Sequence, residues 1–117
     1  VKFRYPFGEL GLVPELGSSV LLPRVVGLTR AKKLMQYGPE FTAQEALEWG
    51  LCSEVVPTKE VLPRAVEAAK KMAKMPQFAL RESKRLLQKD LVATIDSITQ
   101  EELQTLRKAI VSPETQK

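Results

Sequence analysis

The sequence predicts a mostly α-helical fold with short β remnants, on three observations. Three short segments each end at a glycine, at Gly27, Gly38 and Gly50. Glycine suits the left-handed residue just past a helix end, because it has no Cβ to clash there. Longer segments in the second half carry apolar residues at helical spacing. Only residues 2–5 and 51–56 read as strands, and two such pieces cannot form an independent sheet.

In the first half of the chain, the expected strand at 2–5 stops at a proline, which cannot donate to a β-ladder. A loop rich in glycine and proline then leads into the first helix. We expect helices over residues 18–26, 30–37 and 43–49. The third helix opens with a capping box, in which Thr42 and Glu45 satisfy free backbone N–H groups reciprocally.

In the second half, a helix is expected over about 59–74, with Pro63 tolerated if it falls in the first turn. Pro76 separates it from a helix at about 77–90, and a last helix is expected at about 93–110. The apolar stripes of these helices fit packing between subunits, and they fit an intrachain helical hairpin equally well.

Composition narrows the class of protein. Apolar residues make up 44% and charged residues 27% of the 117, as in ordinary globular proteins. No apolar run is long enough to cross a bilayer, and no secretory leader opens the chain, so neither a membrane partner nor secretion is expected. The single cysteine, Cys52, allows no internal disulfide and favours a reducing, cytoplasmic location. Without histidine, a zinc site and a Ser-His or Cys-His catalytic pair are excluded within this chain.

The net charge of +4 has two interpretations: a solvated surface, or attraction of an anion such as a phosphorylated cofactor. Nucleic acid is not expected as a partner, because the basic residues are dispersed and few aromatic residues lie among them. The basic residues that could meet such an anion are Arg24, Arg30, Lys32 and Lys33. Plain core packing is expected of Leu10, Leu21, Leu22, Tyr37, Trp49 and Cys52.

Two acids lie in the loop before the first helix. Glu9 is expected to face solvent or to play a structural part. Glu15 stands between Pro14 and Leu16, just before a Gly-Ser-Ser turn. One interpretation is a helix opening, because proline presets φ and a carboxylate favours the positive end of the helix dipole. The other interpretation is a catalytic base.

The ordered motifs of residues 6–57 resemble the second half of the crotonase (enoyl-CoA hydratase/isomerase) superfamily. They are Pro6-Phe7, Gly11-Leu12-Val13-Pro14, Gly17-Ser18-Ser19, Leu22-Pro23-Arg24 with Gly27, Phe41-Thr42-Ala43-Gln44-Glu45-Ala46, Gly50-Leu51 and Val55-Val56-Pro57. The resemblance implies the C-terminal half of an α/β crotonase (ClpP/crotonase-like spiral) fold. Residues 1–57 would be the end of the crotonase core with the active-site loop, and 58–117 a C-terminal helical packing and oligomerisation region. Family members are longer, and their preceding part supplies the oxyanion-hole N–H groups.

The family's reactions pass through an enolate of a coenzyme A thioester, which needs a positioned base and donors for the oxyanion. Hydratases of the family carry a catalytic glutamate directly after the first motif proline, where this chain has Phe7. The segment from Pro14 to Ser19 is instead similar to that of the Δ3-Δ2-enoyl-CoA isomerases of the peroxisomal type, in which this glutamate is the base. By resemblance, Glu15 takes a proton from C2 of a 3-enoyl-CoA and returns it at C4.

The resemblance also implies the surroundings of the site. Phe7, Leu12, Val13 and Leu16 are the candidate walls of an acyl pocket, with plain core packing as the alternative. Residues that would bind the coenzyme A moiety stay unassigned. The substrate is an acyl-CoA, and neither a separate cofactor nor a metal is expected.

Three functions remain open on the sequence. The first is an isomerase of fatty acid (lipid) metabolism, active as a full-length homo-oligomer, a trimer or hexamer, with this chain alone inactive. The second is an enoyl-CoA hydratase or another acyl-CoA lyase of the family. The third is a catalytically inert oligomerisation fragment.

Overall fold

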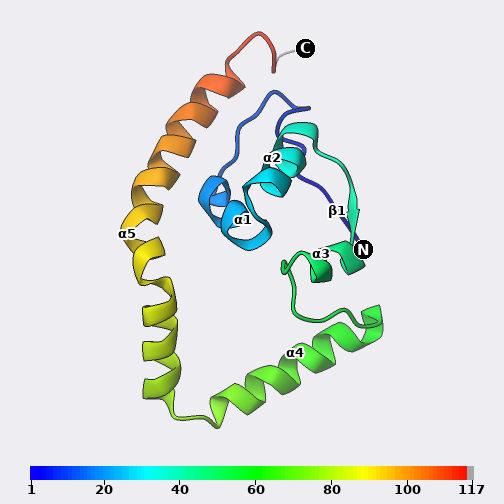
Figure 1. The fold of residues 1–117 in the computed structure, drawn as a ribbon, viewed down its shortest axis with the longest axis vertical. Coiled ribbons are helices and arrows are strands. Elements are labelled where there is room, and N and C mark those ends of the chain that lie inside the picture. The colour runs from blue at the N-terminus through cyan, green and yellow to red at the C-terminus, as the bar shows by residue number, and fades with distance from the viewer. Residues whose placement is uncertain (116–117) are drawn as a thin grey trace.

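The computed structural model describes residues 1–115 and is mostly helical, with two very short strands (Figure 1). Its elements are β1 (Lys2–Phe3), α1 (Ser18–Val26), α2 (Leu28–Tyr37), β2 (Phe41–Thr42), α3 (Ala43–Glu48), α4 (Thr58–Ala73) and α5 (Gln77–Ile110). The predicted fold class, mostly α with short β remnants, is therefore confirmed. The capping box of α3 is also formed, with Thr42 and Glu45 bonded reciprocally. The Thr42 backbone N–H and hydroxyl, which both donate to the Glu45 carboxylate, hold the pKa of Glu45 below its usual range.

The strand predicted at 51–56 is wrong. The segment that pairs with β1 is β2, antiparallel, with Lys2 opposite Thr42 and Phe3 opposite Phe41. Residues 51–56 are irregular. Leu51, the first of them, is bonded to α3 instead, since its N–H donates to the Ala46 carbonyl at 2.8 Å. Leu51 and Cys52 also pack against the core. A β-rich stretch without a neighbouring strand has no ladder to join.

The core lies between α1, α2, β2 and α3. Its buried apolar residues are Leu22, Val26, Ala31, Leu34, Met35, Phe41 and Ala46, and Tyr5, Phe7, Trp49, Leu51 and Cys52 pack against them. Core packing is wrong for three of the predicted residues. Leu10 and Leu21 are exposed, and Tyr37 is 78% exposed. Tyr37 lies about 200° around α2 from the buried Met35, which places it near the opposite side of that helix.

The two helices predicted at 77–90 and 93–110 are one helix, α5. No glycine or proline lies between Asp90 and Ala93, so nothing in the backbone stops the helix there. The helix bends in its middle, in the yellow segment of Figure 1. The Thr94 hydroxyl donates to the Asp90 carbonyl at 2.7 Å there, and back-bonding of this kind often bends helices.

The condition on which Pro63 was expected to be tolerated, a place in the first turn of its helix, is not met. Because α4 begins at Thr58, Pro63 is its sixth residue and lies in the second turn. A proline at that depth removes the N–H that would bond the Lys59 carbonyl. Pro76 does separate α4 from α5, as predicted.

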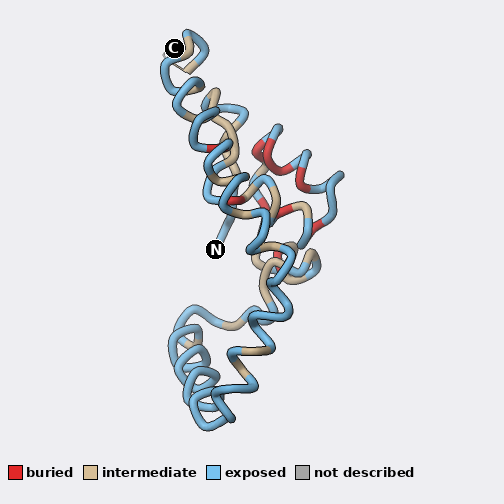
Figure 2. The backbone as a smooth tube through the Cα atoms, turned by 90° about the vertical axis from the view of Figure 1, so that its left-hand side faces the viewer, coloured by how far each residue is buried: buried red, intermediate tan, exposed pale blue. Residues whose placement is uncertain are grey.

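The chain is elongated for its length. Its radius of gyration is 17.4 Å, whereas a compact domain of this size has about 13 Å. Figure 2 shows that buried positions gather around α1–α3, while α4 and the neighbouring part of α5 are exposed or half-buried. The two helices diverge from the turn between them, so the intrachain hairpin is not formed (Figure 1). The stripe of α4 that includes Val61, Leu62 and Val66 is left uncovered by the described residues.

Candidate functional site

The loop that precedes α1 is fixed against the end of α2. The Gly8 N–H points to the Met35 carbonyl at 3.4 Å, and a Cβ on Gly8 would run into the backbone carbonyl of Gln36. Within the loop, the Leu12 N–H donates to the Phe7 carbonyl at 2.8 Å. These contacts hold the loop close to the core.

At the loop's outer edge, Glu9 pairs with Arg4, and both side chains are substantially exposed. This confirms the first of the two roles predicted for Glu9, that it faces solvent. An exposed ion pair of this kind contributes little to stability.

A strained turn connects this loop to α1. Leu16 and Gly17 both have left-handed backbone angles, with φ of 55° and 76°. Leu16 is the single non-glycine residue with positive φ among the described residues, and this conformation costs an L-residue about 1–2 kcal/mol. A Cβ on Gly17 would lie 2.5 Å from Cδ1 of Ile95 in α5. Glycine therefore suits this position for its backbone angles and for the close approach of Ile95. Such strain persists only where the surroundings enforce it, and it clusters at functional sites.

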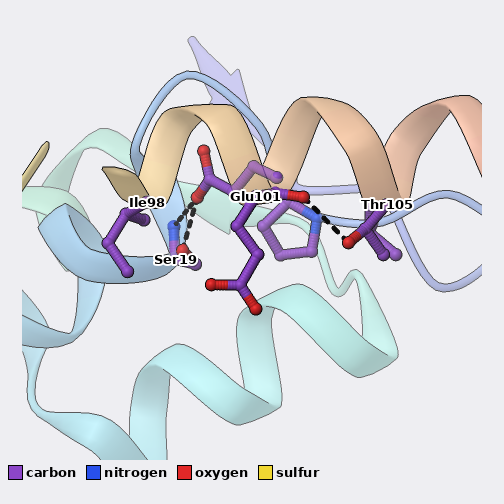
Figure 3. A pocket seen from close by; sticks show the side chains of 7 residues that line it. Ser19, Ile98, Glu101 and Thr105 are labelled. Carbon is purple, nitrogen blue, oxygen red and sulfur yellow. Dashed lines mark hydrogen bonds between the residues drawn. The ribbon is translucent and has the colours of Figure 1, made fainter. Parts of the chain in front are cut away.

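A carboxylate from the far end of the chain caps α1. Oε2 of Glu102 accepts from the Gly17 N–H at 2.6 Å. Oε1 accepts from the Ser19 N–H at 3.0 Å and from the Ser19 hydroxyl. Figure 3 shows the two bonds from Ser19 of α1, beside Ile98, which lies in α5 like Glu102. Glu102 is only 8% exposed, although it carries a carboxylate.

Sequence reasoning missed Glu102. The signal was present, because Glu102 lies seven residues after Ile95 and four after Ile98, in the apolar stripe of α5. A carboxylate in an apolar stripe that faces the core needs hydrogen-bond donors. No local pattern around Glu102 indicates which donors these are.

Glu15 does not open α1. That helix begins at Ser18 and has no acidic residue in its first turn, so the helix-opening interpretation is wrong. The main chain of Glu15 accepts from the Ser18 N–H at 3.0 Å. Its carboxylate is exposed and makes no hydrogen bond or ion pair within residues 1–115. The side chain is therefore free to meet a ligand.

Glu15 lines a hollow of about 360 Å³, called the Glu15 hollow below. Its other lining residues are Tyr5, Phe7, Leu16, Ser18, Leu21, Leu22, Val25 and Leu51. The walls are thus almost entirely apolar, and Glu15 is the one ionisable carboxylate among the residues that line it. The structure brings together three of the five predicted site residues here: Glu15, Phe7 and Leu16.

Leu12 and Val13 line a neighbouring hollow of about 350 Å³, which Phe7 also borders. Lys32 lies on its rim and is exposed. The other basic residues considered for an anion, Arg24, Arg30 and Lys33, are exposed as well. The guanidinium of Arg30 lies 4.8 Å from the centre of the Trp49 ring.

The Ser18 hydroxyl is a second polar group beside the Glu15 hollow. Its oxygen is buried and has no hydrogen-bond partner within the described part of the chain. A buried hydroxyl without a partner is costly, and native proteins leave few of them. The hollow therefore combines apolar walls with one free carboxylate and one unpaired hydroxyl.

Residues 1–115 hold no group of three or more acidic, cysteine or histidine side chains that could bind a metal ion. None of the helices in this range is both long enough and apolar enough to span a membrane. The Glu15 carboxylate can accept a proton from a ligand that is bound against the apolar walls of the hollow, and it can return that proton.

Removing the hydroxyl of each of the two adjacent serines of α1 is expected to change the stability differently. Ser19→Ala should lower the free energy of unfolding by about 1.5–3 kcal/mol, because a hydrogen bond to a buried carboxylate is lost. Ser18→Ala should leave it unchanged or raise it, because the hydroxyl removed has no partner. The measurement is urea unfolding of the product of the complete reading frame that contains these 117 residues, called the full-length protein below. An equal loss in both variants would mean that Ser18 finds a partner outside these residues.

Comparison with known proteins fits this geometry. The family model described as "Enoyl-CoA hydratase/isomerase" matches residues 1–117. The chain is 34% identical to enoyl-CoA delta isomerase 2 of Rattus norvegicus over 112 residues, which cover 96% of the chain and 29% of the rat protein. It is 37% identical to 2,3-dehydroadipyl-CoA hydratase of Escherichia coli over 86 residues, 74% of the chain and 34% of that protein.

A solved structure of an enoyl-CoA hydratase/isomerase from Pseudoalteromonas atlantica superposes with a TM-score of 0.95 at 31% identity, covering 99% of this chain and 47% of that one. The chain thus spans less than half the length of the relatives it matches. The family match extends over every residue, and the superposition on the solved relative covers nearly the whole chain. The chain therefore belongs to the enoyl-CoA hydratase/isomerase family, with a crotonase-type fold.

Proposed function

We propose that the full-length protein is an enoyl-CoA isomerase that shifts the double bond of a 3-enoyl-CoA, with Glu15 as the catalytic base. The observation that carries this proposal is the unpaired Glu15 carboxylate on the apolar wall of the Glu15 hollow. A cap or an ion pair would occupy that carboxylate, and Glu102 already serves as the cap of α1. The isomerase among the relatives supports the same function.

The proposed reaction needs one carboxylate. Glu15 removes a proton from C2, which breaks the C2–H bond and sends its electrons toward the thioester carbonyl as a dienolate. The enolate then collapses with formation of the C2–C3 double bond, and C4 takes the proton from the Glu15 carboxyl. No atom is gained or lost, and the carboxylate is regenerated. Phe7 and Leu16, which share the hollow with Glu15, would contact the acyl chain.

Hydration is the second candidate, and the hydratase among the relatives favours it. Adding water across a double bond is helped by two carboxylates, one to activate the water and one to move the proton. The residues that line the Glu15 hollow supply one, and Phe7 stands where hydratases of the family carry the other. Isomerisation is therefore the better fit to this hollow.

The remaining parts of the proposal concern the whole protein. Its substrate is an acyl-CoA of lipid metabolism, and it needs no cofactor beyond the coenzyme A thioester itself. It works in the cytoplasm as a homo-oligomer, a trimer or hexamer. The uncovered apolar side chains of α4 support the oligomer, because apolar patches of this kind are typical of interfaces. An inert oligomerisation fragment remains the alternative for the 117 residues alone.

The test is a product analysis with two substrates. We expect the full-length protein to convert a 3-enoyl-CoA to the 2-enoyl-CoA without a change of mass, and to add water to a 2-enoyl-CoA far more slowly. Mass spectrometry separates these outcomes, because hydration adds one water. The 117-residue chain alone should show no turnover. Preferential hydration would assign the full-length protein to the hydratases, and no turnover of either substrate by the full-length protein would refute the proposed function.

A further inference from the structure

Beyond the base itself, the structure points to a residue that sets its position: we infer that Glu102 is a positioning residue for Glu15. The two residues are far apart in sequence, and Glu102 reaches the active loop only through the fold. The Gly17 N–H and the Ser19 N–H that it binds lie 85 and 83 residues away in the chain. This inference rests on the proposed function, because it concerns the same carboxylate base.

Glu102 replaces a cap that the sequence near α1 does not provide. The N-cap residue of α1 is Gly17, which has no side chain to accept the free N–H groups of the first turn. Both oxygens of Glu102 are used, one by Gly17 and the other twice by Ser19. A buried carboxylate against a helix N-terminus forms strong, charge-assisted bonds. The start of α1 is therefore anchored to α5.

The anchored segment is the strained turn next to the base. Leu16, with φ of 55°, is 80% exposed, so packing of its own side chain does little to hold it in the left-handed region. The restraints lie on its C-terminal side, where Gly17 contacts Ile95 and bonds to Glu102. Without them, Leu16 can relax to negative φ, and this rotates the Glu15 carboxylate relative to the hollow. A proton shuttle between two carbons does not tolerate such a shift, because misplacement by about 1 Å can cost about 10²-fold in rate.

Glu102→Gln in the full-length protein tests the inference, with Glu101→Gln as the matched control. Glu101 is the preceding residue on α5, and it is exposed. Glutamine keeps the size of Glu102 but loses the charge and turns one acceptor into a donor that faces an N–H. We expect kcat for 3-enoyl-CoA isomerisation to fall roughly 10- to 100-fold with little change in KM, since the position of the base changes and the substrate contacts do not. Glu101→Gln should keep the wild-type kcat.

Two further measurements separate positioning from a general loss of structure. Amide hydrogen exchange at Gly17 and Ser19 should accelerate in Glu102→Gln while exchange at the buried Leu34 stays as in the wild type. In the Glu15→Gln background, Glu102→Gln should lower kcat no further, because Glu102 acts only through Glu15. If Glu102→Gln does not fold, Ser19→Ala removes one of the three hydrogen bonds and is expected to give a smaller loss in kcat of the same kind.

An unchanged kcat in Glu102→Gln, in an active wild-type background, would overturn the inference. So would a further loss of kcat in the double variant, or faster exchange spread over the whole core. A wild-type protein without isomerase activity is a different result, which refutes the proposed function. In that case, unchanged exchange at Gly17 and Ser19 in Glu102→Gln would also refute the anchoring itself.

Discussion

Glu15→Gln in the full-length protein is expected to lower kcat for 3-enoyl-CoA isomerisation by about 10²- to 10⁴-fold, the usual contribution of a positioned general base. Glutamine has the shape of glutamate and lines the same hollow, but it cannot accept the C2 proton and hold it for C4. Affinity for the coenzyme A ester should change little, because the apolar walls around position 15 are untouched. The measurements are steady-state kinetics with a 3-enoyl-CoA and calorimetric titration with a saturated acyl-CoA.

Glu9→Gln is the control for this prediction. Glu9 lies in the same loop as Glu15 and pairs with Arg4 at the surface. We expect this variant to keep the wild-type kcat. Full activity of Glu15→Gln would remove Glu15 from the reaction. Equal losses in the two variants would indicate a disturbed loop rather than a missing base.

The second large effect is expected at Leu34 of α2. Its side chain is 1% exposed and is the largest fully buried one among the described residues. Leu34→Ala should lower the free energy of unfolding of the full-length protein by about 2–5 kcal/mol, because apolar burial is lost and a cavity remains in the core. Urea unfolding monitored by circular dichroism measures this loss, and the m-value reports whether the folded state keeps its compactness.

Leu28→Ala is the matched control, since it makes the same substitution in the same helix. Leu28 is 60% exposed, and we expect a loss below about 1 kcal/mol. The loop with Phe7 and Gly8 packs against the last turn of α2, so Leu34→Ala should also loosen the candidate site. Similar losses in both leucine variants would show that a segment outside residues 1–115 covers Leu28.

Much of the local structure could be predicted because its causes lie close together in the chain. Glycines at 27, 38 and 50 have positive φ. The helices before Gly27 and Gly38 end at the predicted residues, and the helix before Gly50 ends one residue earlier than predicted, at Glu48. The capping box forms because Thr42 and Glu45 are three residues apart on the same turn. The errors at 51–56 and at 91–92 came from the same local reasoning. A β-rich stretch forms a strand only beside a partner, and a helix continues through any residue that does not stop it.

The residues predicted for the candidate site were also only partly placed correctly. The motif around Glu15 predicted the base of the proposed reaction, and Phe7 and Leu16 do lie in the same hollow as Glu15. Leu12 and Val13 lie four and three residues before Leu16, yet they line the neighbouring hollow, which shares Phe7 with the Glu15 hollow. Sequence spacing in an irregular loop does not determine which side chains face each other.

The sequence by itself determined the family, the helical character of the chain and the carboxylate for the proposed chemistry, since these follow from motifs and from short-range backbone preferences. Only the tertiary structure showed that Glu15 leaves the capping of α1 to another residue. Glu102 takes that part from a distance of more than 80 residues, and α5 brings it there by packing Ile95 against Gly17. Such a contact depends on how α5 crosses α1, and no local preference of the chain contains that information.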